Sequence, residues 1–177
     1  MKKVIINVVL VILIFISYFL QSNFFNWFTI AGISPNLFVI LIVFIGLFGN
    51  KFMGISYGIL LGFFLDYLFR SKIGISAIAL GLVGVFAKIF DKNFSKDSRI
   101  TIMLMISALT IFYEVFSYVA SYIIFSTNLE FLYFIRILIV EVIYNVILTV
   151  ILYPQMQKFG YYIENTYSGN KILTRYF

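Results

Sequence analysis

The chain has no cysteine and no histidine among its 177 residues, and it has only two prolines. Cysteine and histidine are the commonest ligands of structural zinc, so we expect no dedicated metal centre, no cofactor held by one and no disulfide. Charged residues are also scarce, at 11%, whereas a soluble domain has about 25%. The composition therefore excludes an ordinary soluble domain.

What the chain has in place of charge is apolar surface, with 63% hydrophobic residues and 22 phenylalanines. We therefore predict an all-α integral membrane protein in which residues 1–177 form a single transmembrane domain. Several apolar segments approach the roughly 20 residues that a membrane-spanning helix needs. The six predicted transmembrane helices are 4–20, 36–49, 52–69, 73–90, 100–125 and 134–153.

The first two segments end in different ways. The second segment is short, and a tight Gly49-Asn50-Lys51 connector follows it, so segments two and three are expected to form a helical hairpin, with a re-entrant hairpin as the alternative. The first segment lacks a small-x-small site after Leu20 and is expected to stay attached rather than be cleaved as a signal peptide.

The distribution of lysine and arginine predicts that both termini are cytoplasmic. Arg70 and Lys72 would then lie outside and Arg136 within the last segment. The ten inner residues would be Lys2, Lys3, Lys51, Lys88, Lys92, Lys96, Arg99, Lys158, Lys171 and Arg175. Topology and attraction to anionic membrane lipid account for the net charge of +6, so no nucleic-acid partner is expected. Pro154 is expected to end the last helix, leaving residues 155–177 as a cytoplasmic tail on the inner membrane surface.

Catalytic motifs fail on inspection. Gly54-Ile55-Ser56-Tyr57-Gly58 matches G-x-S-x-G, but a nucleophile elbow also needs a histidine base. Aspartyl chemistry would need a second carboxylate beside Asp66, and the other aspartates, Asp91 and Asp97, fall in a predicted cytoplasmic loop. We therefore expect a protein that is not an enzyme.

The third segment carries three glycines and an acid at intervals of four residues. Gly54, Gly58, Gly62 and Asp66 share one helix face, which would be smooth enough to receive another helix. An acidic residue inside a membrane span indicates function by default. The sequence thus predicts a partner-docking surface that ends at Asp66, near a membrane boundary.

A second polar group is predicted in the outer half of the last two segments. At the helical rise of about 1.5 Å per residue, Glu114, Arg136 and Glu141 all fall in the outer half, with Arg136 near the outer boundary and Asn145 deeper on nearly the same face as Glu141. Because an unpaired charge there is costly, Arg136 is expected to pair with Glu114, Glu141 or Asp66. The cluster is either a polar lock between helices or an outward-facing cavity that binds a ligand or partner.

Several stretches carry a resemblance to a known family. They are Gly32-Ile33-Ser34-Pro35-Asn36-Leu37, Gly58 to Leu68, Gly74 to Leu80, Glu141-Val142-Ile143-Tyr144-Asn145 and Leu152-Tyr153-Pro154. Together with the chain length and the number of spans, they resemble the MreD family of rod shape-determining proteins. One departure is Asn36, where the family often has an acid.

The resemblance implies a non-enzymatic membrane subunit of the bacterial elongation (rod) complex in the cytoplasmic membrane. Its implied partners are MreC and, indirectly, RodA, a class B penicillin-binding transpeptidase and MreB, with a role in cell shape and sidewall peptidoglycan synthesis. The family also resembles in fold the substrate-binding subunits of energy-coupling-factor transporters, so the alternative is a small-molecule-binding subunit of a vitamin transporter. Those subunits use Ala-x-x-x-Ala-type residues on the first span, whereas Val4 to Leu20 contains neither alanine nor glycine.

Overall fold

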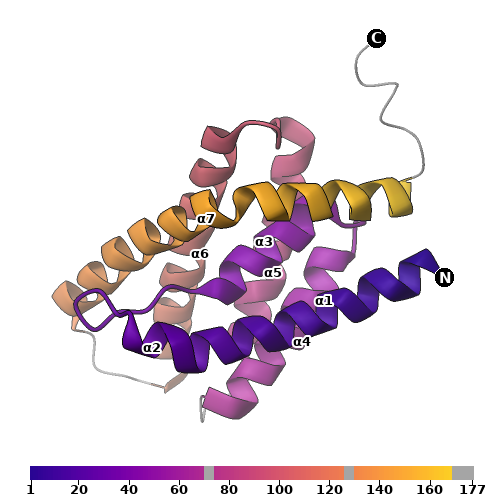
Figure 1. Cartoon of the computed structure of the whole chain (residues 1–177). Coiled ribbons are helices and arrows are strands. Elements are labelled where there is room, and N and C mark those ends of the chain that lie inside the picture. The colour runs from indigo at the N-terminus through magenta and orange to yellow at the C-terminus, as the bar shows by residue number, and fades with distance from the viewer. Residues whose placement is uncertain (70–73, 126–129, 169–177) are drawn as a thin grey trace.

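The computed structural model describes residues 1–69, 74–125 and 130–168, and Figure 1 shows that they form a bundle of helices. A π-helical turn, η1 (Leu20–Phe24), and a short helix, α2 (Phe25–Trp27), extend the first main helix. The six main helices are α1 (Lys2–Phe19), α3 (Leu37–Phe48), α4 (Met53–Phe69), α5 (Ile75–Asn93), α6 (Arg99–Phe125) and α7 (Phe131–Ser168). The predicted all-α membrane fold is confirmed.

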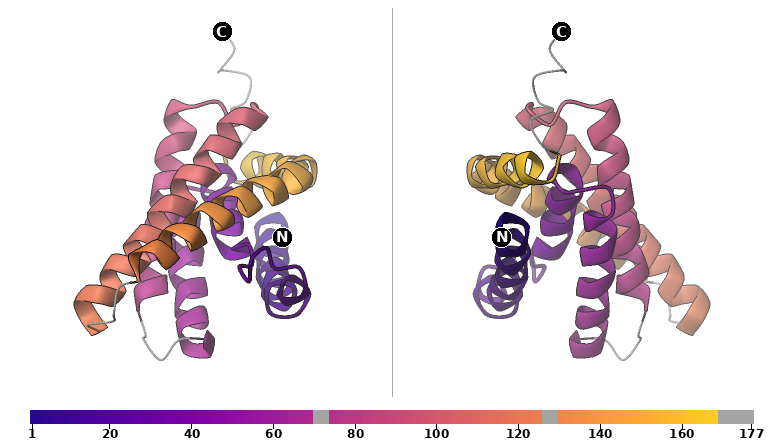
Figure 2. Two further views of the ribbon diagram at one scale, coloured as in Figure 1. Left: turned by 90° about the vertical axis from the view of Figure 1, so that its left-hand side faces the viewer. Right: turned by 90° about the vertical axis from the view of Figure 1, so that its right-hand side faces the viewer.

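The main helices differ in length, and only some of them are long enough to cross a membrane. Among the described residues, the extended α1, α6 and α7 are long and apolar enough to cross a membrane, whereas α3 and α4 are apolar but shorter. Figure 2 shows α4 and α5 running roughly upright and α6 crossing them obliquely, with α1 seen nearly end-on. The other main helices surround α3, which lies in the middle of the bundle.

The shortest main helix, α3, forms the centre of the fold. All of its 12 residues are buried, and α1, α4, α5, α6 and α7 each pack against it. A helix that is apolar on every side is expected to be enclosed in this way. At about 1.5 Å per residue it is roughly 18 Å long, much less than the ~30 Å thickness of a bilayer core. Both of its ends therefore need hydrogen-bond partners from the rest of the chain.

The C-terminal end of α3 receives these partners from a lysine on α5. Lys88 Nζ donates to the carbonyl oxygens of Gly49 at 2.9 Å and Leu47 at 3.5 Å. The same ammonium group pairs with Asp91 at 2.9 Å. A positive charge at a helix C-terminus also complements the helix dipole.

A buried group of charges continues from this point. Lys96 is 7% exposed and pairs with Asp91 at 2.9 Å and with Glu164 of α7 at 2.8 Å. Burial alone would raise the pKa of Asp91, but the ammonium groups of Lys96 and Lys88 outweigh it and hold that pKa below its ordinary value. Asp91 therefore stays ionised at neutral pH, and the ion pairs of the cluster tie α5, the α5–α6 connection and α7 together.

The helix α7 continues through Pro154 to Ser168, so the expectation that Pro154 ends it is wrong. Proline removes one backbone donor, and tertiary contacts on the following turns can offset that loss. Tyr153 donates to the backbone carbonyl of Asp97 at 2.9 Å, and Tyr161 donates to the Asp97 carboxylate. Of the predicted tail, residues 169–177 lie outside the described residues.

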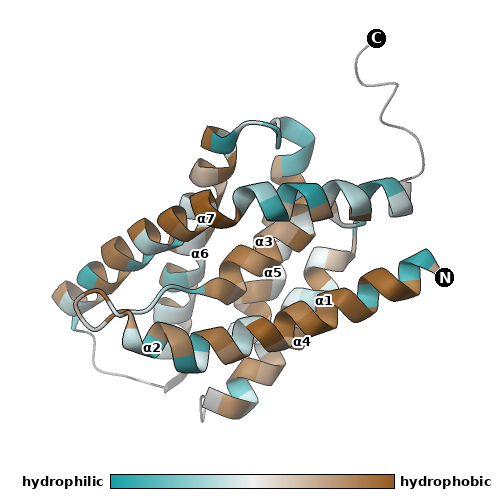
Figure 3. Cartoon of the chain, in the orientation of Figure 1, coloured by the Kyte–Doolittle hydropathy of each residue, from teal (hydrophilic) through white to brown (hydrophobic). Residues whose placement is uncertain are grey.

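The beginning of α1 and the end of α7 lie side by side. Tyr167 donates to the Asn7 side chain at 3.0 Å and to the backbone carbonyl of Lys3 at 3.5 Å. Since Lys96 binds Glu164 and Lys88 binds Gly49, the connections α3–α4 and α5–α6 lie at this same end. Hydrophilic residues gather there in Figure 3. We call this the basic end of the molecule.

The glycine stripe of α4 packs against α5. A Cβ atom added at Gly58 would lie 2.4 Å from the Leu80 carbonyl oxygen, and one added at Gly62 would lie 2.3 Å from Ala77 Cα. At Gly54 the added atom would lie 2.8 Å from Cα of Gly46 in α3. Within the chain, α5 and α3 lie on this stripe, and its role as a partner-docking surface stays a prediction.

Replacing Gly62 by alanine is predicted to destabilise the protein. The substitution gains up to about 1 kcal/mol of helix propensity, but the new methyl group meets backbone atoms that cannot move aside, at a cost of about 1–3 kcal/mol or more. The control is Gly81→Ala, whose methyl group would meet only the Ile59 side chain, at 2.9 Å. Thermal unfolding in detergent should rank Gly62→Ala well below Gly81→Ala, and equal midpoints would contradict the close contact.

Candidate functional site

A polar cavity of about 410 Å³ lies at the end of α3 opposite Gly49. All six main helices or their extensions contribute to its wall. The lining residues are Gln21, Ser22, Asn26, Ser34, Pro35, Asn36, Phe38, Leu65, Ser76, Tyr113, Glu114 and Glu141. The volume is in the range of small-molecule sites in proteins, about 300–1,000 Å³.

The π-helical turn η1 positions the first part of this wall. Gln21 Nε2 donates to the carbonyl oxygen of Pro35 at 2.5 Å, and Gln21 Oε1 accepts the backbone N–H of Leu37 at 3.1 Å. One side chain thus holds the start of α3 against the extension of α1. Such π turns are frequent at functional sites.

The connection from α2 to α3 forms the next part of the wall. It turns at Ala31 and Gly32, which both have left-handed backbone angles, φ +54° and +80°. The flanking residues exchange two backbone hydrogen bonds, of 2.9 and 3.0 Å. Tyr144 of α7 donates to the carbonyl oxygen of Phe28 at 2.6 Å and holds this connection in place. Ser34, Pro35 and Asn36 follow the turn and reach the cavity.

Asn145 joins the start of α3 to two other helices. Its side chain is fully buried, accepts the backbone N–H of Asn36 at 2.8 Å and donates to the Thr110 hydroxyl at 3.0 Å. Asn36 in turn caps α3 by accepting the Val39 N–H at 3.2 Å. Asn145, named from the sequence as a site residue, therefore lies behind the cavity wall and supports it.

The structure brings Glu114 of α6 and Glu141 of α7 together on the cavity wall. Arg136 does not join them, because its side chain is exposed and donates to the carbonyl oxygen of Ala31 at 3.4 Å. Within residues 1–69, 74–125 and 130–168, no ion pair links Arg136 to an acid. The predicted pairing of Arg136 with Glu114, Glu141 or Asp66 is not found.

Asp66 caps the N-terminus of α5. The carboxylate is fully buried and accepts the backbone N–H groups of Gly74 at 2.8 Å, Ser76 at 3.0 Å and Ala77 at 3.4 Å. Gly74 has φ +109°, a conformation that favours glycine. Within the chain, Asp66 therefore pairs with backbone N–H groups beside Ser76 of the cavity wall, and its role in binding a partner stays a prediction. Arg70 and Lys72, which were predicted on the outer side of the membrane, are not among the described residues.

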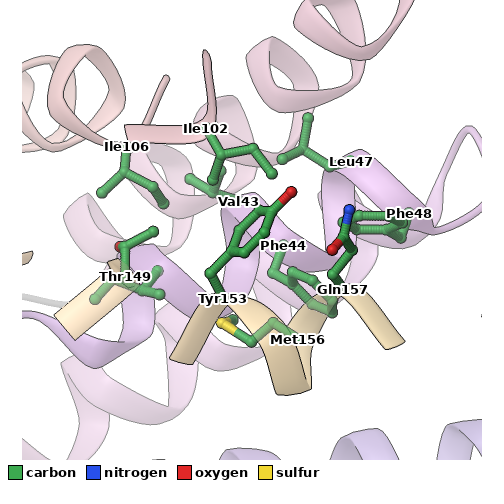
Figure 4. Close-up of a pocket in the computed structure, with 11 residues that line it drawn as sticks. Val43, Phe44, Leu47, Phe48, Ile102, Ile106, Thr149, Tyr153, Met156 and Gln157 are labelled. Atoms are coloured by element: carbon green, nitrogen blue, oxygen red, sulfur yellow. The ribbon is translucent and has the colours of Figure 1, made fainter. Parts of the chain in front are cut away.

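A second space is apolar and very small. It lies between α3, α6 and α7, and Figure 4 shows the side chains around it. Its volume of about 10 Å³ is close to the minimum for one water molecule, and apolar gaps of this kind stay dry. We assign it no binding role. Among the described residues, no group of three acidic or other ligating side chains is placed to hold a metal ion.

Seven polar residues of the cavity wall were not identified from the sequence as site residues. They are Gln21, Ser22, Asn26, Ser34, Asn36, Ser76 and Tyr113. A signal was present for Asn36, since an asparagine just before an apolar run is a helix N-cap signature. For Gln21 and Ser22 the signal was weaker, namely polar residues immediately after an apolar helix.

The buried acid and the exposed base lead to opposite predictions. Asp66→Ala leaves buried N–H groups of α5 unpaired and should lower the free energy of unfolding by about 3 kcal/mol, with Asp66→Asn milder because its amide oxygen still accepts. Arg136→Ala should change it by less than about 0.5 kcal/mol. Denaturant unfolding of the purified variants measures both, and an Asp66→Ala variant as stable as the parent would refute the capping role.

The family model described as rod shape-determining protein MreD matches residues 1–163 of the 177-residue chain. No curated protein and no solved structure matches the chain. The predicted resemblance is thus confirmed by a match that includes α1, α3, α4, α5 and α6 in full and α7 as far as residue 163. The chain belongs to the MreD family, and this membership implies a role in rod shape determination and a place in the inner membrane.

Proposed function

We propose that this protein is a non-enzymatic membrane subunit of the bacterial rod complex that binds MreC and helps control sidewall peptidoglycan synthesis. The observation that carries the proposal is the family match over residues 1–163. Through MreC, the subunit would act indirectly on RodA, a class B penicillin-binding transpeptidase and MreB. Shape determination follows from the family, whereas these named contacts are the proposal.

We propose further that both termini are cytoplasmic. The support is the gathering of Lys3, Lys88 and Lys96 at the basic end, together with the first turn of α1 and the last described turns of α7. Positive residues near the ends of membrane helices favour the cytoplasmic side. The polar cavity, at the opposite end of α3, would then face the outer side of the membrane.

Membrane lipid is the proposed partner of the exposed apolar faces. On α1 the exposed large side chains include Val8, Ile12, Phe15 and Phe19, and on the described part of α7 they include Ile143 and Ile151. Contiguous exposed surface of this kind is expected only where lipid or another apolar partner covers it.

A second candidate function is a small-molecule-binding subunit of an energy-coupling-factor-type vitamin transporter. The polar cavity of about 410 Å³ favours it. The first helix weakens it, because Val4 to Leu20 has no small residues with which to dock a coupling subunit.

The proposed orientation predicts which single cysteines are accessible from outside. In a chain with no other cysteine, a membrane-impermeant thiol reagent added to intact cells should label Asn23→Cys and leave Asn93→Cys unlabelled. Both asparagines are exposed, at opposite ends of the molecule, so they form a matched pair. Labelling of Asn93→Cys alone would reverse the orientation.

The proposed partner is tested by isolating the tagged chain from native membranes in mild detergent and identifying the proteins retained. We expect an MreC protein, absent when an unrelated multi-pass membrane protein carries the same tag. Cells depleted of the chain should become round and swollen. Capture of a transporter coupling subunit with its ATPases, in cells that stay rod-shaped, would decide for the second candidate.

A further inference from the structure

We propose that the polar cavity binds an uncharged, hydroxyl-rich group about the size of one sugar ring. This inference goes beyond the proposed role in cell shape, since it assigns the cavity a ligand of its own. The volume of about 410 Å³ lies at the lower end of the range for small-molecule sites and is enough for a single sugar ring with its hydroxyl groups.

The chemistry of the wall mixes acceptors with donors. Glu114 and Glu141 supply carboxylate oxygens, which only accept when ionised. Asparagine and serine side chains beside them both donate and accept, and Asn26 and Ser34 are examples. A hydroxyl group can satisfy both kinds, because it carries one donor and two acceptor positions.

Ions fit this wall less well. A phosphate group offers acceptors only, so it cannot donate to the acceptor oxygens of Glu114 and Glu141, and it would be repelled by them when they are ionised. An ammonium group offers donors only, so it would leave amide N–H groups on the wall without an acceptor. The apolar side chains Phe38 and Leu65 complete the wall and suit the C–H faces of a ring.

The wall is also held rigidly before any ligand binds. Gln21 is fixed by Pro35 and Leu37, and Asn26 donates to the carbonyl oxygen of Ser22 at 2.8 Å. Preorganised polar groups reduce the entropic cost of binding. The Ser22 hydroxyl differs from these groups. Ser22 belongs to the cavity wall, and its Oγ is buried just behind the cavity surface, without a hydrogen-bond partner among the described residues. A buried hydroxyl in this state indicates a site for a further polar group.

The hydroxyl-rich group could belong to a free sugar or to a lipid headgroup, and the experiment separates these sources. The full-length chain is placed in nanodiscs of phosphatidylcholine, which has no sugar and no glycerol headgroup. Methyl glucoside is the soluble probe, monoglucosyl diacylglycerol doped into the disc is the lipid probe, and ethanolamine and inorganic phosphate are the charged controls. Thermal unfolding and calorimetry measure binding. We expect one of the two sugar probes to raise the unfolding midpoint by several degrees, with neither ion doing so.

Ser22→Ala then tests the site itself. Because the hydroxyl has no protein partner, its removal should leave the stability of the free protein unchanged or slightly higher. Loss of one hydrogen bond to the ligand should weaken the affinity about three- to tenfold. The matched control is Ser17→Ala, on α1 just before η1 and outside the cavity wall. Asn26→Ala, at an exposed position, provides a second variant that is expected to fold.

Three results would overturn the proposal: no shift with either sugar probe, a larger shift with ethanolamine or phosphate, or unchanged sugar affinity in both Ser22→Ala and Asn26→Ala. Partner capture is measured separately in native membranes. A failure here therefore leaves the proposed association with MreC standing, and a failed capture leaves the sugar site standing.

Discussion

The arrangement of this protein depends on satisfying the backbone of a short helix in the middle of an apolar bundle. Unpaired N–H and C=O groups are very costly where no water can reach them. A helix that spans the bilayer places its free ends in the polar headgroup region, but the 12-residue α3 cannot do so. The free N–H and C=O groups at its two ends must therefore form hydrogen bonds with other parts of the chain. This requirement explains why polar residues are present in the interior.

These residues come from distant parts of the sequence. Gln21 and Asn145 accept the N–H groups at the beginning of α3, and Lys88 donates to the carbonyl groups at its end. Asp66 serves the beginning of α5 in the same way. Each bond joins two helices as well as capping one, so the caps also fix how the helices pack. Close contact at Gly58 and Gly62 brings α4 near enough to α5 for the Asp66 cap to form.

The cavity follows from the same constraint. The N-terminal ends of α3 and α5 lie at one end of the molecule, so the polar groups that serve them gather there, with Asn36 and Ser76 on the cavity wall. Glu114 and Glu141 complete that wall from α6 and α7. The opposite end is closed by the buried pairs of Lys96 with Asp91 and Glu164. The molecule thus has an open polar cavity at one end and buried ion pairs that hold the helices together at the other.

The sequence by itself determined the class, the six main helices and the family, because hydrophobic composition, segment length and motif spacing are local properties of the chain. It also placed Glu114 and Glu141 in the same outer half, since depth follows from the helical rise. It could not determine what covers a given helix face. The α4 glycines and Asp66 were therefore interpreted as a partner surface although α5 lies on them, and Pro154 as a helix end although contacts near Asp97 carry α7 onward. Only the tertiary structure decided these points, because helix periodicity groups residues on a face while packing between distant segments chooses their neighbours.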